Sequence, residues 1–219
     1  MPIRLHRVFF AALALVALAA TAAAGALAAP KSPNPGRAQG HAPKSGVHGG
    51  VTKPKAGSTV LTVDATTLSA LTTAGVTVTP FGTATGASPA FTFPITGGSV
   101  VYKKANHGHG KGSKRKLLAG NVVHTGSGMT LTKGTTTVTI SDLRINLSAG
   151  KTGRIDASLP HGKIKLATLS GVAVDATTKS ISATATLTQA AVNALNTTFG
   201  TTLPAAGAPL GAVVITPTF

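Results

Sequence analysis

The sequence predicts an all-β protein: an antiparallel β-sandwich, or a partly closed barrel, of about 9–12 strands with two short helices. Over residues 130–148, apolar residues alternate with Thr, Ser, Asn or Arg, which is the period-two pattern of half-buried strands. Similar segments recur at intervals of roughly 8–12 residues with Gly-rich turns between them. Helical spacing of apolar residues is confined to two short stretches, so strands must build most of the core.

The alternation changes phase once within this stretch. Val138 and Ile140 share one parity, whereas Leu143 and the apolar residues after it take the other. A bulge or corner at Ser141-Asp142 would keep both sets facing one core. We expect strands at residues 59–63, 76–79, 91–95, 98–103, 117–125, 128–132, 135–141, 143–148, 153–159, 163–169, 171–175, 180–187 and 212–216.

Two short helices interrupt the strands. Asp64 is expected to cap the first, with Leu68 and Leu71 on one face and Gly75 as its stop. Thr188 is expected to cap the second, in which apolar residues at i, i+3 and i+7 precede Gly200. The two regions resemble each other weakly, which fits either an internal duplication or a shared Ala/Thr-rich composition.

The chain divides into three segments by composition. Residues 1–28 are typical of a secretory signal peptide, with Arg4 and Arg7 before an apolar run and Ala26-Leu27-Ala28 as the cleavage site. An uncleaved membrane anchor is the alternative. Residues 29–57 are rich in Pro, Gly and Lys and predict a disordered basic linker. The β-domain is then expected over residues 58–219, in a secreted protein associated with the cell envelope.

Charge and composition restrict the partners. The 20 Lys and Arg residues against 4 acidic ones give a formal charge of +16, which favours an anionic cell-wall polymer or membrane surface. The absence of Cys excludes disulfides and thiolate chemistry. With no Trp and one Tyr, stacking platforms for bases are excluded, and we expect no specific nucleic acid. The large core residues are expected to be Phe81, Phe91, Phe93, Phe199 and Phe219.

One basic segment, residues 103–116, lies between two predicted strands and is expected to be a long mobile hairpin loop. Its glycines would let it follow an irregular polymer, and each cation would neutralise one phosphate or carboxylate. A solvated insertion without a partner is the alternative. His107 and His109 within it lack a third ligand for a metal site. The predicted polyanion-binding residues are Lys103, Lys104, Lys111, Lys114, Arg115 and Lys116.

An enzyme is not expected, because a hydrolytic site needs a base and an orienting carboxylate. The four Asp residues are better explained structurally. Asp64 suits a helix cap, and Asp142, Asp156 and Asp175 suit bulges or turns. His124 and His161 are expected at strand ends or turns.

From Gly120 onward the order of segments resembles the HtaA-type domain of Gram-positive surface haem-uptake proteins. The residues that carry the resemblance are G-N-V-V-H-T-G-S-G-M-T-L, T-V-T-I-S-D-L-R-I-N-L, G-R-I-D-A-S-L, I-K-L-A-T-L-S-G-V and A-T-L-T-Q-A-A-V-N-A-L. The resemblance implies a β-sandwich with two short helices, exported to the envelope. In that family an aromatic-rich helix supplies a Tyr that ligates haem with a His partner.

This chain departs from the family at those positions. The opening L-T-V-D-A-T-T-L-S-A-L has no Trp, Tyr or Phe, and Ser127 stands at the place of the family's His. We therefore expect a non-catalytic envelope protein that binds anionic polymer and has no cofactor. A haem-binding or haem-relay protein and a structural spacer are the alternatives. The residues able to ligate haem are Tyr102, His107, His109, His124 and His161.

Overall fold

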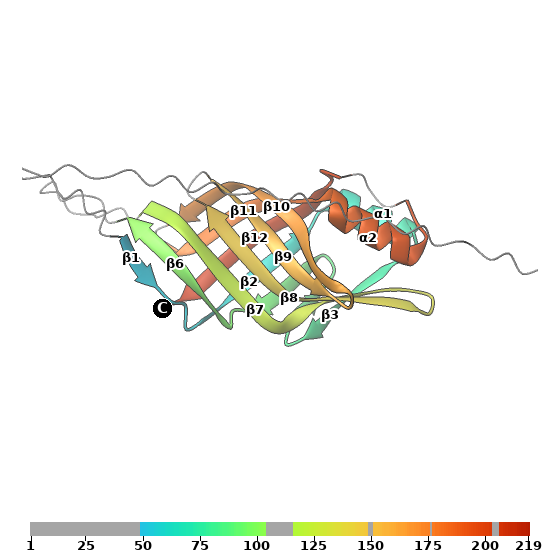
Figure 1. Ribbon diagram of the computed structural model, residues 1–219, viewed down its shortest axis with the longest axis horizontal. Helices are drawn as coiled ribbons and strands as arrows, with labels where there is room; N and C mark the ends of the chain where they lie inside the picture. The colour runs from blue at the N-terminus through green and yellow to red at the C-terminus, as the bar shows by residue number, and fades with distance from the viewer. Residues whose placement is uncertain (1–48, 104–115, 149–150, 176, 203–205) are drawn as a thin grey trace, which may run out of the picture. The chain divides into compact units, whose positions relative to one another are not determined.

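A computed structural model describes residues 49–103, 116–148, 151–175, 177–202 and 206–219 (Figure 1). The chain separates into residues 1–44 and residues 45–219, and every element described here belongs to the second unit. The predicted signal peptide and most of the predicted linker lie outside the described residues. None of the helices in the described ranges has the length and apolarity to span a membrane.

Twelve strands and two helices make up the described residues, which confirms the predicted all-β class. The helices are α1 (Ala65–Thr73) and α2 (Gln189–Phe199). The strands are β1 (Gly49–Thr52), β2 (Ala56–Val63), β3 (Thr77–Gly82), β4 (Thr85–Ala87), β5 (Ala90–Pro94), β6 (Gly97–Lys103), β7 (Lys116–Lys133), β8 (Thr136–Ser148), β9 (Thr152–Leu159), β10 (Gly162–Asp175), β11 (Ser180–Leu187) and β12 (Pro209–Thr218).

All the strand pairs are antiparallel and belong to a single sheet. Its order is β1-β6-β7-β8-β9-β10-β11-β12-β2-β5-β4, with β3 paired to β7. The sheet curls so that inward-facing side chains of β2, β5, β7, β8, β9, β10 and β12 line one small interior space. This arrangement agrees with the predicted sandwich. The helices lie near one end of the strands (Figure 1), and buried residues of both line one interior space together with the sheet.

The predicted bulge in β8 is confirmed. Between Ser141 and Arg144 the pairing of β8 with β9 shifts register, and Asp142 takes a left-handed φ of 50°. The Asp142 carboxylate accepts hydrogen bonds from the Gly126 N–H at 2.9 Å and the Ser141 hydroxyl at 3.1 Å. As a result, both parities of apolar residues in β8 are buried.

Both predicted helix caps are confirmed. The Asp64 carboxylate accepts from the Thr66 N–H at 2.9 Å, and the Thr188 hydroxyl oxygen accepts from the Ala191 N–H at 3.1 Å. Gly200 ends α2 with φ 59°, a left-handed conformation that costs glycine little. Leu71 of α1, and Val192, Leu195 and Phe199 of α2, are buried against the sheet.

Aliphatic side chains form most of the core, as predicted, with few aromatic ones among them. Phe91 and Phe93 are fully buried in β5, and Phe199 is buried in α2. The prediction for the other two phenylalanines was wrong. Phe81 lies at the end of β3 and is 40% exposed, and Phe219 at the end of the chain is 39% exposed.

Several strand boundaries differ from the prediction. Segments expected as separate strands are continuous: β7, β8 and β10 each join two of them through a bulge. Two short strands, β1 and β4, were not predicted. Because β1 and the first residues of β2 precede Ser58, the boundary expected at residues 57 and 58 has to move toward the N-terminus.

Candidate functional site

His124 is buried in the middle of β7, not at a strand end as predicted. Its Nδ1 lies 3.0 Å from the Leu143 carbonyl oxygen, and its Nε2 lies 2.8 Å from the Thr59 hydroxyl oxygen. A carbonyl only accepts, so Nδ1 carries the proton, and Nε2 of the neutral ring accepts from Thr59. The edge of the ring meets Phe93, with the centroids 6.3 Å apart. Both nitrogens are therefore engaged within the core.

The charge state of His124 follows from this environment. Burial lowers the pKa of His124 below its usual 6.5, and the hydrogen bond to the Leu143 carbonyl opposes this only in part. A neutral, fully enclosed imidazole whose two nitrogens are bonded has none left for iron. Among the predicted haem ligands, His124 is therefore better explained as a structural core residue.

Of the remaining predicted residues, His161 lies in the exposed β9–β10 turn, and the others lie in β6, in β7 or between these strands in the sequence. Tyr102 of β6 pairs with Gly50 of β1 on one side and Leu117 of β7 on the other. Lys103 and Lys116 are paired across β6 and β7, and the loop predicted between them lies outside the described residues. The other predicted residues lie outside the described ranges: Lys104, His107, His109, Lys111, Lys114 and Arg115.

The exposed face of α1 borders an open groove of about 1000 Å³. Small side chains at helical spacing keep it open, and the turn after α2 forms its other wall. The groove is lined by Ala65, Thr66, Ser69, Ala70, Thr73, Ala74, Gly200, Thr201 and Thr202. These residues offer hydroxyl and methyl groups but no imidazole, phenol or thioether. The groove has the volume for a macrocycle, yet its lining residues do not fit a haem that needs a protein ligand on its iron.

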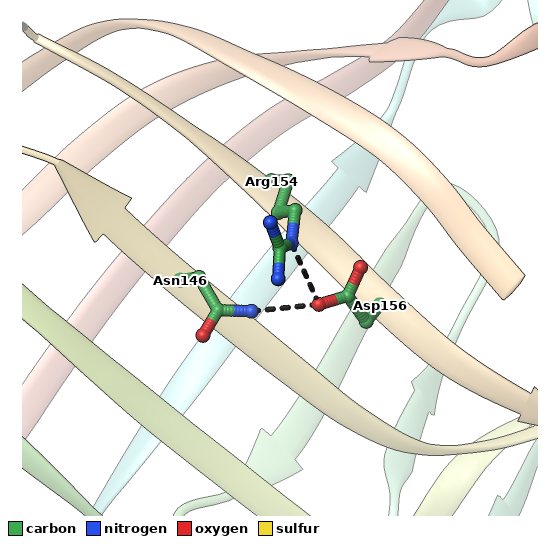
Figure 2. Close-up of polar contacts among 3 residues, drawn as sticks. All are labelled: Asn146, Arg154 and Asp156. Atoms are coloured by element: carbon green, nitrogen blue, oxygen red, sulfur yellow. Dashed lines mark hydrogen bonds and ion pairs between the residues drawn. The ribbon is translucent and has the colours of Figure 1, made fainter. Parts of the chain in front are cut away.

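A second groove, of about 560 Å³, lies on the outward face of β8, β9 and β10. Figure 2 shows its central contacts: one Asp156 oxygen accepts from Asn146 Nδ2 at 2.8 Å and from Arg154 Nε at 2.9 Å. Asp156 lies within β9 and not at a turn or bulge of its own strand, contrary to the prediction. Arg144, Lys163 and Lys165 complete the charged lining together with Asp142.

Sequence reasoning missed this outward groove. Arg144, Arg154, Lys163 and Lys165 all stand at exposed positions of alternating strands, and this alternation was the available signal. The strand order that brings them together could not be read from the sequence.

The other carboxylates have structural roles. Asp64 and Asp142 act as described above, and Asp175 accepts from the Thr177 and Thr178 N–H groups in the turn after β10. Hydrogen bonding by the Thr178 side chain, followed by that of the two N–H groups, lowers the pKa of Asp175. Within the described ranges, no three residues among His, Asp and Glu gather as a metal site would require.

Comparison with solved structures identifies a protein with a similar fold. The C-terminal domain of HtaA from Corynebacterium glutamicum matches with a TM-score of 0.53 and 17% identity, over 76% of this chain and 98% of that domain. The chain has the HtaA fold. This confirms, at the level of fold, the resemblance found in the sequence. No family model matches the sequence, and no curated protein does.

Two further structures match with lower TM-scores. A domain-swapped dimer of a variant of the same HtaA domain has a TM-score of 0.42 and 16% identity, over 67% of this chain and 85% of that one. The heme binding protein HtaB from the same organism has a TM-score of 0.41 and 14% identity, over 78% and 96%. The expectation of no cofactor is corrected by the match to the HtaA domain, because the family that the sequence resembles is one of haem-uptake proteins.

Proposed function

We propose that this protein is an exported, non-catalytic haem-binding protein with the HtaA fold. The observation that carries the proposal is the match to the HtaA C-terminal domain, which extends over 98% of that domain. Fold similarity supports a function only by analogy, so the proposal depends on whether this chain can supply an iron ligand.

The candidates for that ligand are reduced by geometry. The α1 groove offers no ligand side chain, and both nitrogens of His124 are engaged. We therefore assign iron ligation to Tyr102, His107 or His109, which belong to β6 and the sequence that follows it, with the exposed His161 of the β9–β10 turn as the alternative. A phenolate or an imidazole from these residues would hold the haem iron and influence its absorption spectrum.

Titration of the mature protein with haemin tests the proposal. We expect saturable binding with a shift of the Soret band relative to free haemin in the same buffer. Serum albumin provides a positive control for the haemin stock. A titration that ends with the spectrum of free haemin would refute the function, whatever the fold.

We propose a second function, retention at an anionic cell-envelope surface, which explains the charge. Lys103 and Lys116 face each other at the hairpin base, and further Lys and Arg side chains outnumber the four carboxylates. The expected result is retention on purified wall polymer that falls steeply as salt rises. Retention that does not respond to salt would contradict an electrostatic contact.

A further inference from the structure

The outward groove of β8–β10 has an ordered arrangement of cations. Cross-strand pairing places Arg144, Asp156 and Lys165 in one row, because Asp156 of β9 is opposite Arg144 on one side and Lys165 on the other. The next row contains Ser158 opposite Lys163. Cations of three strands thus surround a single central carboxylate on one exposed face.

The central carboxylate does not neutralise this cluster. Asp156 forms an ion pair with Arg154. It is the one ion pair found within the described ranges. Asp142 at the groove wall is engaged by the Gly126 N–H and the Ser141 hydroxyl at the bulge. Arg144, Lys163 and Lys165 are all exposed, and none of them forms an ion pair within the described ranges.

Arg154 is also held in place. It bonds Asp156 through Nε, and the Nη donors of the planar guanidinium take no part in that bond. Asn146 donates to the same Asp156 oxygen from β8 and fixes the carboxylate in turn. An arginine held this way loses less conformational entropy when it meets an oxyanion than a free one does.

The backbone is irregular in the strands on either side of β9. Both neighbours of β9 carry an irregularity at the same level: β8 between Ser141 and Arg144, and β10 between Lys165 and Ala167. Bulges bend a strand, increase its twist, and occur often beside binding sites. The groove therefore coincides with irregularities in both strands that flank β9.

We propose that this groove binds a linear polyanion through oxyanion groups spaced along the chain. No aromatic side chain lines the groove, so sugar or base rings have nothing to stack on and recognition rests on charge. A single small anion would meet one or two of the four cations, whereas a chain crossing three strands meets all of them. The inference rests on the envelope-binding function and names a site for it on the folded domain.

The test uses short-chain polyphosphate as the probe, with affinity measured at two salt concentrations. The groove variant replaces three cations that no carboxylate pairs: R144Q/K163Q/K165Q. We expect affinity to fall at least about tenfold and the slope of log K against log salt to lose about three units, one for each removed phosphate contact. Circular dichroism and thermal unfolding confirm that both proteins are folded.

A matched control carries the same change in net charge elsewhere on the described surface. This control variant is K53Q/K55Q/K179Q, at three exposed lysines outside the groove. It should keep affinity within about twofold, apart from a general charge effect. If both variants lose affinity equally, binding follows net charge and the groove is not a site.

Two further probes separate the sources of oxyanions. Inorganic phosphate at the same total phosphate should compete poorly, and equal competition would show a single-ion site and overturn the linear ligand. Vesicles of phosphatidylglycerol should bind the groove variant and the parent alike, and a groove-dependent vesicle signal without polyphosphate binding would overturn the proposal in favour of a membrane. Should the parent protein fail to bind any polyanion, the envelope function itself fails, which differs from equal binding by parent and groove variant.

Discussion

The Nε2 atom of His124 lies 2.8 Å from the hydroxyl oxygen of Thr59, although 65 positions separate the two residues. Both side chains are buried, with Thr59 2% exposed and His124 fully enclosed. β7 and β2 are not neighbours in the sheet order, so this hydrogen bond crosses the interior. It joins two parts of the curled sheet with a polar contact in an aliphatic core.

Removing the Thr59 hydroxyl should destabilise the protein. Thr59→Val keeps the shape of the side chain but leaves His124 Nε2 buried without a donor, which costs about 1–3 kcal/mol. Urea unfolding monitored by circular dichroism measures the change. Thr62→Val, at an exposed position of the same strand, should change stability by less than about 0.5 kcal/mol. Equal effects of the two changes would mean that the hydrogen bond contributes little.

Stability should fall as the pH is lowered through 6.5. Burial lowers the pKa of folded His124 below 6.5, so between that lowered pKa and 6.5 the unfolded chain binds a proton that the folded protein does not. The free energy of unfolding then decreases toward acid, by at most about 1.4 kcal/mol per pH unit. Urea unfolding at about pH 7.5 and about pH 5.5 measures the difference.

The matched pair for this pH effect is His124→Gln and His161→Gln. The first removes the buried titrating group and should flatten the dependence, whereas the second changes an exposed residue of the β9–β10 turn and should preserve it. If His124→Gln does not fold, an NMR titration of the parent can follow the His124 ring directly. A ring that titrates at or above 6.5 in the folded state would contradict the explanation.

The bulge in β8 should depend on Asp142 in a particular way. Asp142→Ala loses the acceptor for the Gly126 N–H and puts a less tolerant residue at a φ of 50°, which together cost about 1–2 kcal/mol. Asp142→Asn keeps an oxygen acceptor and suits the left-handed region. Thermal unfolding should therefore rank the parent and the Asn variant together, above the Ala variant. A similar loss in both variants would instead assign the effect to the negative charge.

The parts of the fold that sequence predicted are those in which local pattern and tertiary structure agree. Alternation located β8 and its bulge, because buried and exposed positions follow the pleat directly. β1 was missed because its apolar residue, Val51, is 63% exposed. This strand has no buried apolar face and is defined by its pairing with β6. The break expected between residues 125 and 128 is absent, because β7 continues through it with a bulge that accommodates the extra residues.

The sites needed information that local pattern does not hold. The inward position of His124 follows from alternation in β7, but its partner in β2 depends on how the sheet curls. Arg154 and Asp156 are two residues apart, so their ion pair was within reach of the sequence. The cations around them come from β8 and β10, and their register is set by two bulges whose offsets no local pattern specifies.

The final prediction concerns the iron ligand. Tyr102→Phe combined with His107→Ala and His109→Ala should abolish the Soret shift on haemin titration, because these residues are the assigned sources of the iron ligand. His161→Ala removes another imidazole, from the exposed turn between β9 and β10. This variant should bind haemin as the parent does. The single changes then identify the ligand, since a phenolate and an imidazole give different charge-transfer bands. A triple variant that retains the parent's spectrum would move the iron away from β6, and loss of the spectrum in His161→Ala alone would place it at the β9–β10 turn.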